Sequence, residues 1–103
     1  MTFVNLTPHT INEINSGKAF SPSGDVARVS SEKKEIKKVG GIPLFEVEFG
    51  EVQGLPEPQP DTIYIVSGMV LSAASDREDL VAPGDLVRNE EGQPIGCNGF
   101  RVN

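Results

Sequence analysis

The clearest pattern in the chain is an alternation of apolar and charged residues within positions 42–52. It is formed by Phe45, Glu46, Val47, Glu48 and Phe49. Because successive side chains of a strand point to opposite sides, this spacing predicts a β-strand with one apolar and one charged face. Val52 is out of phase with the apolar set, so a β-bulge is predicted at Gly50 between them.

A buried strand followed by a short helix is predicted in the middle of the chain. Residues 63–66 are a continuous β-favouring run, Ile-Tyr-Ile-Val, which is typical of a strand covered on both faces. After Ser67-Gly68 the apolar residues recur at helical spacing, which predicts a helix over about residues 68–75. Ser75 and Glu78 have the spacing of a capping box and predict a second helical turn before residues 80–81.

The remaining pattern predicts short strands joined by turns. The expected strands are 3–6, 10–14, 26–30, 86–88, 93–97 and 100–102, with turns at 15–18, 21–25, 82–85, 89–92 and 98–99. Residues 55–60 hold three prolines and predict a surface connector. The lysine-rich run 33–38 predicts a solvated hairpin or an edge strand protected by its charges.

These elements predict one α+β domain, residues 1–103, that is mainly β. We expect a small antiparallel or mixed sheet, or a barrel, with one or two short helices around residues 68–81. A length of 103 residues leaves no room for a second core.

Charge limits the classes of partner. The formal net charge is −6, and residues 51–103 carry all of it, with nine acidic and three basic side chains. Because an acidic surface repels the phosphate backbone, we expect no binding to long nucleic acids. We expect neither a membrane span nor a secretory signal peptide, since no apolar run is long enough and the first residues lack a basic segment.

The single cysteine and single histidine limit the chemistry further. Cys97 has no partner for an internal disulfide, which predicts a reducing, cytoplasmic compartment. One Cys and one His cannot supply the ligands of a structural zinc site, and the acidic residues show no calcium-loop spacing. We therefore expect no metal and no cofactor.

Six residues are candidates for binding a small anionic ligand. They are Asn5, Thr7, His9, Ser67, Arg77 and Arg88. Pro8 stiffens the turn that holds the histidine, Ser67 precedes a predicted helix whose first N–H groups favour anions, and arginine forks match phosphate or carboxylate. Each has a simpler alternative: a surface histidine in a turn, a helix cap, or arginines paired with nearby Asp and Glu.

A catalytic pair of His9 and Cys97 is a further hypothesis, with the thiol as nucleophile and the imidazole as base. No signature surrounds Cys97, and a free cysteine is usually a small buried apolar residue. We therefore favour binding over catalysis.

Four stretches together resemble a group of small, uncharacterised proteins of phage and prophage genomes. They are Asn5–Ile11 (NLTPHTI), Thr62–Ser67 (TIYIVS), Asp79–Arg88 (DLVAPGDLVR) and Ile95–Phe100 (IGCNGF). The resemblance covers most of the chain and implies expression in a bacterial cytosol during infection. The group has no established activity, so the resemblance implies a setting and no mechanism.

In that setting we expect a protein that binds a small ligand, with a nucleotide-derived immune signal of the host as one possibility. A chain this short forms only a shallow cleft by itself, so a homo-oligomer with the ligand at a subunit interface is expected. The alternatives are a protein–protein interaction or accessory virion module, and a small hydrolase or transferase.

Overall fold

The computed structural model describes all residues, 1–103, and contains eight strands and one helix. In chain order they are β1 (Thr2–Asn5), β2 (Ile11–Glu13), β3 (Lys18–Phe20), β4 (Ser31–Val39), β5 (Ile42–Phe49), β6 (Thr62–Ile65), α1 (Gly68–Ala73), β7 (Leu80–Arg88) and β8 (Pro94–Arg101). The prediction of a mainly β, α+β fold is confirmed. One short helix is present, not two.

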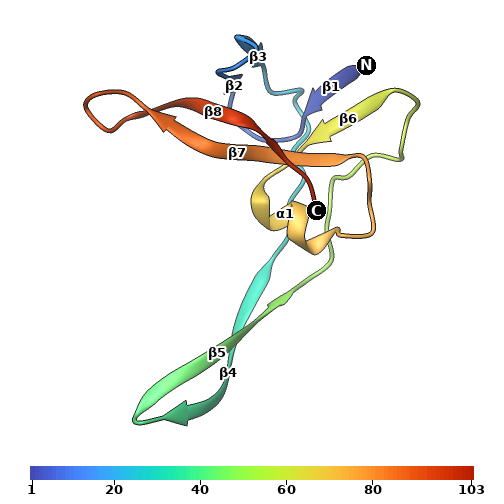
Figure 1. Cartoon of the computed structure of the whole chain (residues 1–103). Coiled ribbons are helices and arrows are strands. Elements are labelled where there is room, and N and C mark those ends of the chain that lie inside the picture. The colour runs from blue at the N-terminus through green and yellow to red at the C-terminus, as the bar shows by residue number, and fades with distance from the viewer.

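Six strands form a mixed sheet in the order β1-β6-β7-β8-β2-β3 (Figure 1). The β6 strand pairs in parallel with both β1 and β7. Tyr64 and Ile65, which point to opposite faces of this strand, are both buried, as the continuous apolar run predicts. Antiparallel hairpins join β7 to β8 and β2 to β3, and β8 pairs with β2 in parallel. The sheet curls until its two edge strands, β1 and β3, lie close to each other.

Aromatic rings and one amide hold this near-closure together. The rings of Phe3, Phe20 and Phe100 contact one another at centroid distances of 5.3–5.8 Å. The Asn5 amide donates to the Phe20 carbonyl at 2.9 Å, and Asn5 also forms a bridge with Pro22. The sheet is therefore a nearly closed barrel whose seam lies between β1 and β3.

The core lies between this sheet and α1. It contains Leu6, Ala27, Tyr64, Val66, Val70, Leu71, Ala74, Leu80 and Ala82. Ser67 caps the helix, because its hydroxyl accepts the Val70 N–H at 3.2 Å, so the capping alternative for Ser67 is confirmed. With six residues, α1 is too short to cross a bilayer, and the chain has no other helix.

The remaining two strands, β4 and β5, form a separate hairpin that projects from the body of the domain (Figure 1). We call this hairpin, residues 31–49, the arm. Every residue of both strands is exposed. The radius of gyration is 16.2 Å, compared with about 13 Å for a compact chain of this length. The arm accounts for the difference.

Several local predictions were wrong. Residues 82–85 and 98–99 lie inside β7 and β8 instead of forming turns, and residues 26–30 contribute one isolated bridge, from Arg28 to Gln53, instead of a strand. The β5 strand ends at Phe49, and the irregularity in the arm lies between Glu35 and Lys37 instead of at Gly50. The capping-box residues after α1 start no second helix.

Candidate functional site

The turn after β1 is held by the side chains of Asn5 and Thr7. The Asn5 amide donates to the carbonyls of His9 (2.7 Å) and Phe20 (2.9 Å). Its oxygen accepts from the backbone N–H (2.9 Å) and the hydroxyl (2.7 Å) of Thr7. Asn5 is 2% exposed and Thr7 8%. All of their polar atoms are therefore engaged inside the protein, and neither side chain is placed to contact a ligand.

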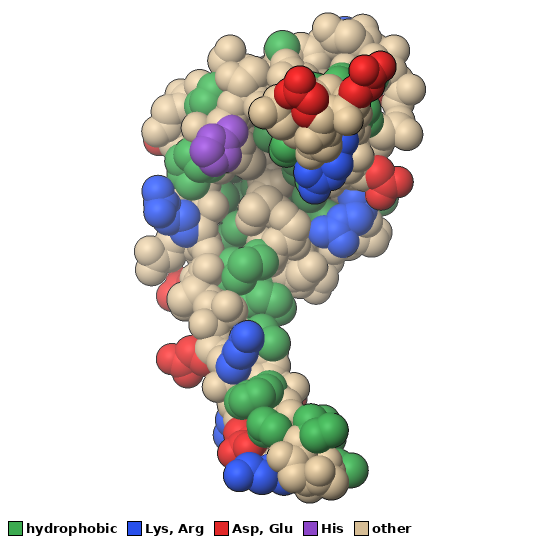
Figure 2. All heavy atoms as spheres, turned by 90° about the vertical axis from the view of Figure 1, so that its left-hand side faces the viewer, with side chains coloured by type: hydrophobic (Ala, Val, Ile, Leu, Met, Phe, Trp, Pro, Cys, Tyr) green, Lys and Arg blue, Asp and Glu red, His purple; other side chains and the backbone are tan.

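His9 is exposed on the body of the domain (the purple side chain in Figure 2). It lines a cavity of about 520 Å³ whose other walls come from residues 10–12 and from β7 and β8. Cys97 lines the same cavity but is buried. Burial raises the pKa of the Cys97 thiol, and a raised pKa reduces the fraction of reactive thiolate. The cavity thus brings the two residues together without activating the sulfur.

Arg77 is used within the fold. Its Nε and Nη2 atoms donate to the two carboxylate oxygens of Asp79, both at 2.8 Å, and Nη2 also donates to the Pro56 carbonyl at 3.0 Å. The Asp79 carboxylate raises the pKa of Arg77, and the Arg77 guanidinium lowers the pKa of Asp79. This pair fixes the proline connector to the start of β7.

We expect Arg77→Ala to lower the free energy of unfolding by about 1–2 kcal/mol, because it removes charge-assisted bonds at a partly buried site. Urea denaturation measures the change. Arg88→Ala is the matched control: its Nη1 donates only to the Gly92 carbonyl (2.8 Å) at an exposed hairpin turn, and we expect a change below about 0.5 kcal/mol. Equal losses for the two variants would contradict the structural role of Arg77.

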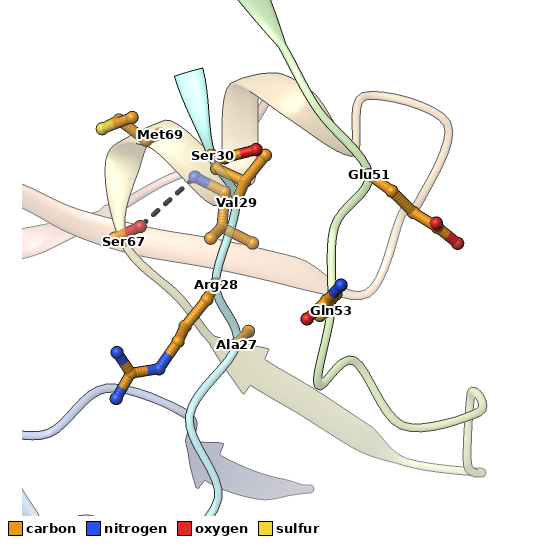
Figure 3. Close-up of a pocket in the computed structure, with 9 residues that line it drawn as sticks. Ala27, Arg28, Val29, Ser30, Glu51, Gln53, Ser67 and Met69 are labelled. Atoms are coloured by element: carbon orange, nitrogen blue, oxygen red, sulfur yellow. Dashed lines mark hydrogen bonds between the residues drawn. The ribbon is translucent and has the colours of Figure 1, made fainter. Parts of the chain in front are cut away.

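Ser67 lies away from these groups, at the base of the arm (Figure 3). There it lines a second cavity, of about 480 Å³, together with Arg28, Ser30, Glu51, Gln53 and Met69 and three apolar residues, Ala27, Val29 and Val70. Arg28 makes no ion pair, since the single ion pair of the chain joins Arg77 to Asp79. The six candidate residues therefore lie in separate parts of the structure. Ser67 shares a cavity with Arg28 and not with Arg77 or Arg88.

Glu13 is a buried carboxylate that the sequence patterns did not single out. Its oxygens accept the backbone N–H groups of Ser16 (2.7 Å), Gly99 (2.8 Å) and Asn15 (3.0 Å). These three bonds, the one from Gly99 first, lower the pKa of Glu13 to about 2. The carboxylate thereby fastens the end of β2 to β8.

The lowered pKa of Glu13 predicts a loss of stability in acid. A depressed carboxyl pKa contributes stability above the unfolded-state pKa of 4.5, and this contribution is lost as the pH falls through about 2. We expect the free energy of unfolding to fall between pH 4.5 and 2, and to fall less steeply in Glu13→Gln. The Arg77 guanidinium also lowers the pKa of Asp79, so the variant still loses stability in acid through Asp79 and keeps part of the slope. Identical slopes in denaturation series at each pH would contradict this assignment.

The largest exposed apolar surface lies on the arm. Figure 2 shows hydrophobic side chains along the whole length of the arm, below the body. Seven large apolar residues of the arm are 37–64% exposed: Ile36, Val39, Ile42, Leu44, Phe45, Val47 and Phe49. The alternation in β5 predicted an apolar face, but the sequence did not show that nothing in the chain covers it.

Comparison of the chain with protein-family models, with curated protein sequences and with solved structures finds no match. No group of three or more His, Cys, Asp or Glu side chains is placed to hold a metal ion. The candidate site therefore depends on the geometry of the chain itself.

Proposed function

We propose that this protein is a protein–protein interaction module that binds through the apolar face of its arm. The observation that carries the proposal is the exposure of Phe45, Val47 and Phe49, which share one face of the arm and are 43–55% exposed. Monomeric soluble proteins rarely expose a continuous apolar patch above a few hundred Å², and larger patches mark interaction sites.

The size of this surface fits the apolar centre of a contact. Applied to side chains of roughly 150–250 Å² each, the exposed fractions of Phe45, Val47 and Phe49 give this face an apolar area on the order of 300 Å². A standard interface buries about 800 Å² on each partner. The three apolar side chains thus supply the centre of such an interface, and the polar row along β4 and the surrounding surface supply the rest.

The arm is also poorly supported by its own domain. At its base, the Arg28–Gln53 bridge and the bond from the Gly50 N–H to the Ser30 carbonyl, at 2.8 Å, pair the two chain segments of the arm with each other and not with the body. An isolated two-stranded hairpin is marginally stable in water. A partner packed on the apolar face would supply the second layer that the hairpin lacks.

This function is tested by the apparent size at which the protein elutes from an unfractionated lysate of the cells that naturally make it. We expect the wild type to elute well above one chain, and a variant with Phe45→Ser, Val47→Ser and Phe49→Ser to elute as one chain. The control changes Glu46 and Glu48 to Ser on the opposite face and keeps the wild-type size. Elution of the wild type as a single chain would refute the proposal.

A second candidate function is binding of a small anionic ligand in the cavity at the base of the arm. Arg28, which makes no ion pair, lines this cavity with Ser67 and favours it, and Glu51, on the chain segment across from Arg28 (Figure 3), limits it to ligands that also offer hydrogen-bond donors. The resemblance to phage proteins supports a nucleotide-derived signal in a bacterial cytosol. ADP-ribose and cyclic dinucleotides are the probes: a rise in melting temperature that Arg28→Ala abolishes is expected, and no rise with any probe would reject it.

A further inference from the structure

We infer that the partner on the arm is a second copy of this chain, and that two arms pack face to face in antiparallel orientation. This inference rests on the proposed function and names its partner. The arrangement is isologous, so it closes as a dimer and does not propagate into a filament.

The register of the hairpin defines the face that would be buried. Residues paired across an antiparallel ladder share a face, and the pairs on the apolar face are Ser31–Phe49, Lys33–Val47 and Glu35–Phe45. The face therefore has an apolar row along β5 and a polar row along β4. In the polar row, a lysine and a glutamate are two positions apart.

This face is complementary to itself. Two antiparallel arms can be related by a two-fold axis that lies between the pairs Lys33–Val47 and Glu35–Phe45. This axis sets each Lys33 against the second copy's Glu35. The same axis sets Val47 against the second copy's Phe45. One geometry thus satisfies the charged row and the apolar row together, whereas an axis through the Lys33–Val47 pair would oppose two lysines.

Charge distribution also favours contact between arms over contact between bodies. The arm contains four lysines and four glutamates, so the whole formal charge of −6 lies on the rest of the chain. Antiparallel packing of the neutral arms leaves the two acidic bodies at opposite ends. At physiological salt, charges separated by more than about 8 Å are largely screened, so this arrangement avoids most of the repulsion.

The β4 edge of the arm favours stacking over edge-to-edge pairing. The lysines of the β4 strand are the residues with which proteins block the addition of another strand to an edge. The apolar side chains instead project from the face of the hairpin, where a second sheet packs at a distance of about 10 Å.

Paired charge reversals test the inference with purified full-length protein. By sedimentation equilibrium, we expect the wild type to have twice the 11.0 kDa of one chain at micromolar concentration. Lys33→Glu and Glu35→Lys should each weaken the dimer about tenfold or more, because each opposes like charges twice. An equimolar mixture of these two variants should restore the dimer, since every facing pair is then opposite in charge. Lys34→Glu, on the other face, is the control.

The outcomes separate this inference from the proposed function. A monomeric purified wild type that still elutes as a larger species from the lysate overturns the dimer and keeps the interaction module. Failure of the mixture to recover, with both variants folded by circular dichroism, overturns the facing of Lys33 and Glu35. Recovery in the mixture supports it, because a purely structural defect in one chain is not repaired by the other.

Discussion

Asn5→Ala is expected to lower the free energy of unfolding by about 3–4 kcal/mol, because buried polar groups without partners cost about 1–3 kcal/mol each. The Asn5 amide makes four hydrogen bonds, and its truncation removes partners from Thr7, from the His9 carbonyl and from the Phe20 carbonyl. The bond to Phe20 crosses the seam of the barrel. The variant therefore weakens both the turn and the closure of the sheet, and urea denaturation measures the loss.

Asn12→Ala is the matched control for this prediction. Asn12 lies on β2, is exposed and donates no side-chain hydrogen bond, so we expect a change below about 0.5 kcal/mol. A loss at Asn5 no larger than the loss at Asn12 would show that the four bonds do not hold the turn.

Gly54→Ala is expected to destabilise the base of the arm by about 2–5 kcal/mol in total. Gly54 has a φ of +84°, and a Cβ atom there would lie 2.5 Å from the Val26 carbonyl oxygen. The left-handed backbone costs a non-glycine residue about 1–2 kcal/mol, and a forced backbone shift costs about 1–3 kcal/mol more. Because Gly54 follows Gln53, which bridges to Arg28, the shift acts on the attachment of the arm.

Gly92→Ala separates the two causes. Gly92 has nearly the same φ, +80°, but a Cβ atom there meets nothing within 4 Å. Denaturation should show that Gly92→Ala lowers the free energy of unfolding by about 1 kcal/mol. The additional loss of stability in Gly54→Ala then measures the clash with the Val26 carbonyl. Equal losses at the two glycines would mean that the close approach at the arm base is absent.

The sequence predicted the elements that depend on local patterns of residues. The continuous apolar run at residues 63–66 became the parallel strand β6 between two neighbours, and Ser67 capped the helix as its type and position predict. Both features depend on residues that are adjacent in the chain. The lysine-rich run also formed one strand of a solvated hairpin.

The predictions failed where distant pairing overrides local turn chemistry. Pro83 and Gly84 are typical turn residues, yet they lie inside β7. A Cβ at Gly84 would lie 2.5 Å from the Asn98 carbonyl, so the glycine serves the close approach of β8 instead of a turn. No pattern within residues 82–85 indicates that neighbour.

The six candidate ligand contacts lie apart for a related reason. Residue type indicated Asn5, Thr7 and Arg77 as possible ligand contacts, but their polar atoms bind groups of the same chain. For Arg77, pairing with Asp79 was one of the alternatives considered from the sequence. The alternation in β5 likewise defined an apolar face without indicating which surface covers it.

Photocrosslinking from the arm tests most directly whether protein covers its apolar face. Phe45 is replaced by p-benzoylphenylalanine, and Glu46, on the opposite face, is replaced in a parallel sample. Irradiation should convert the position-45 protein into a product with the mass of two chains and leave the position-46 protein unchanged. No two-chain product from position 45, or equal yields from both positions, would contradict the packing of two arms through this face.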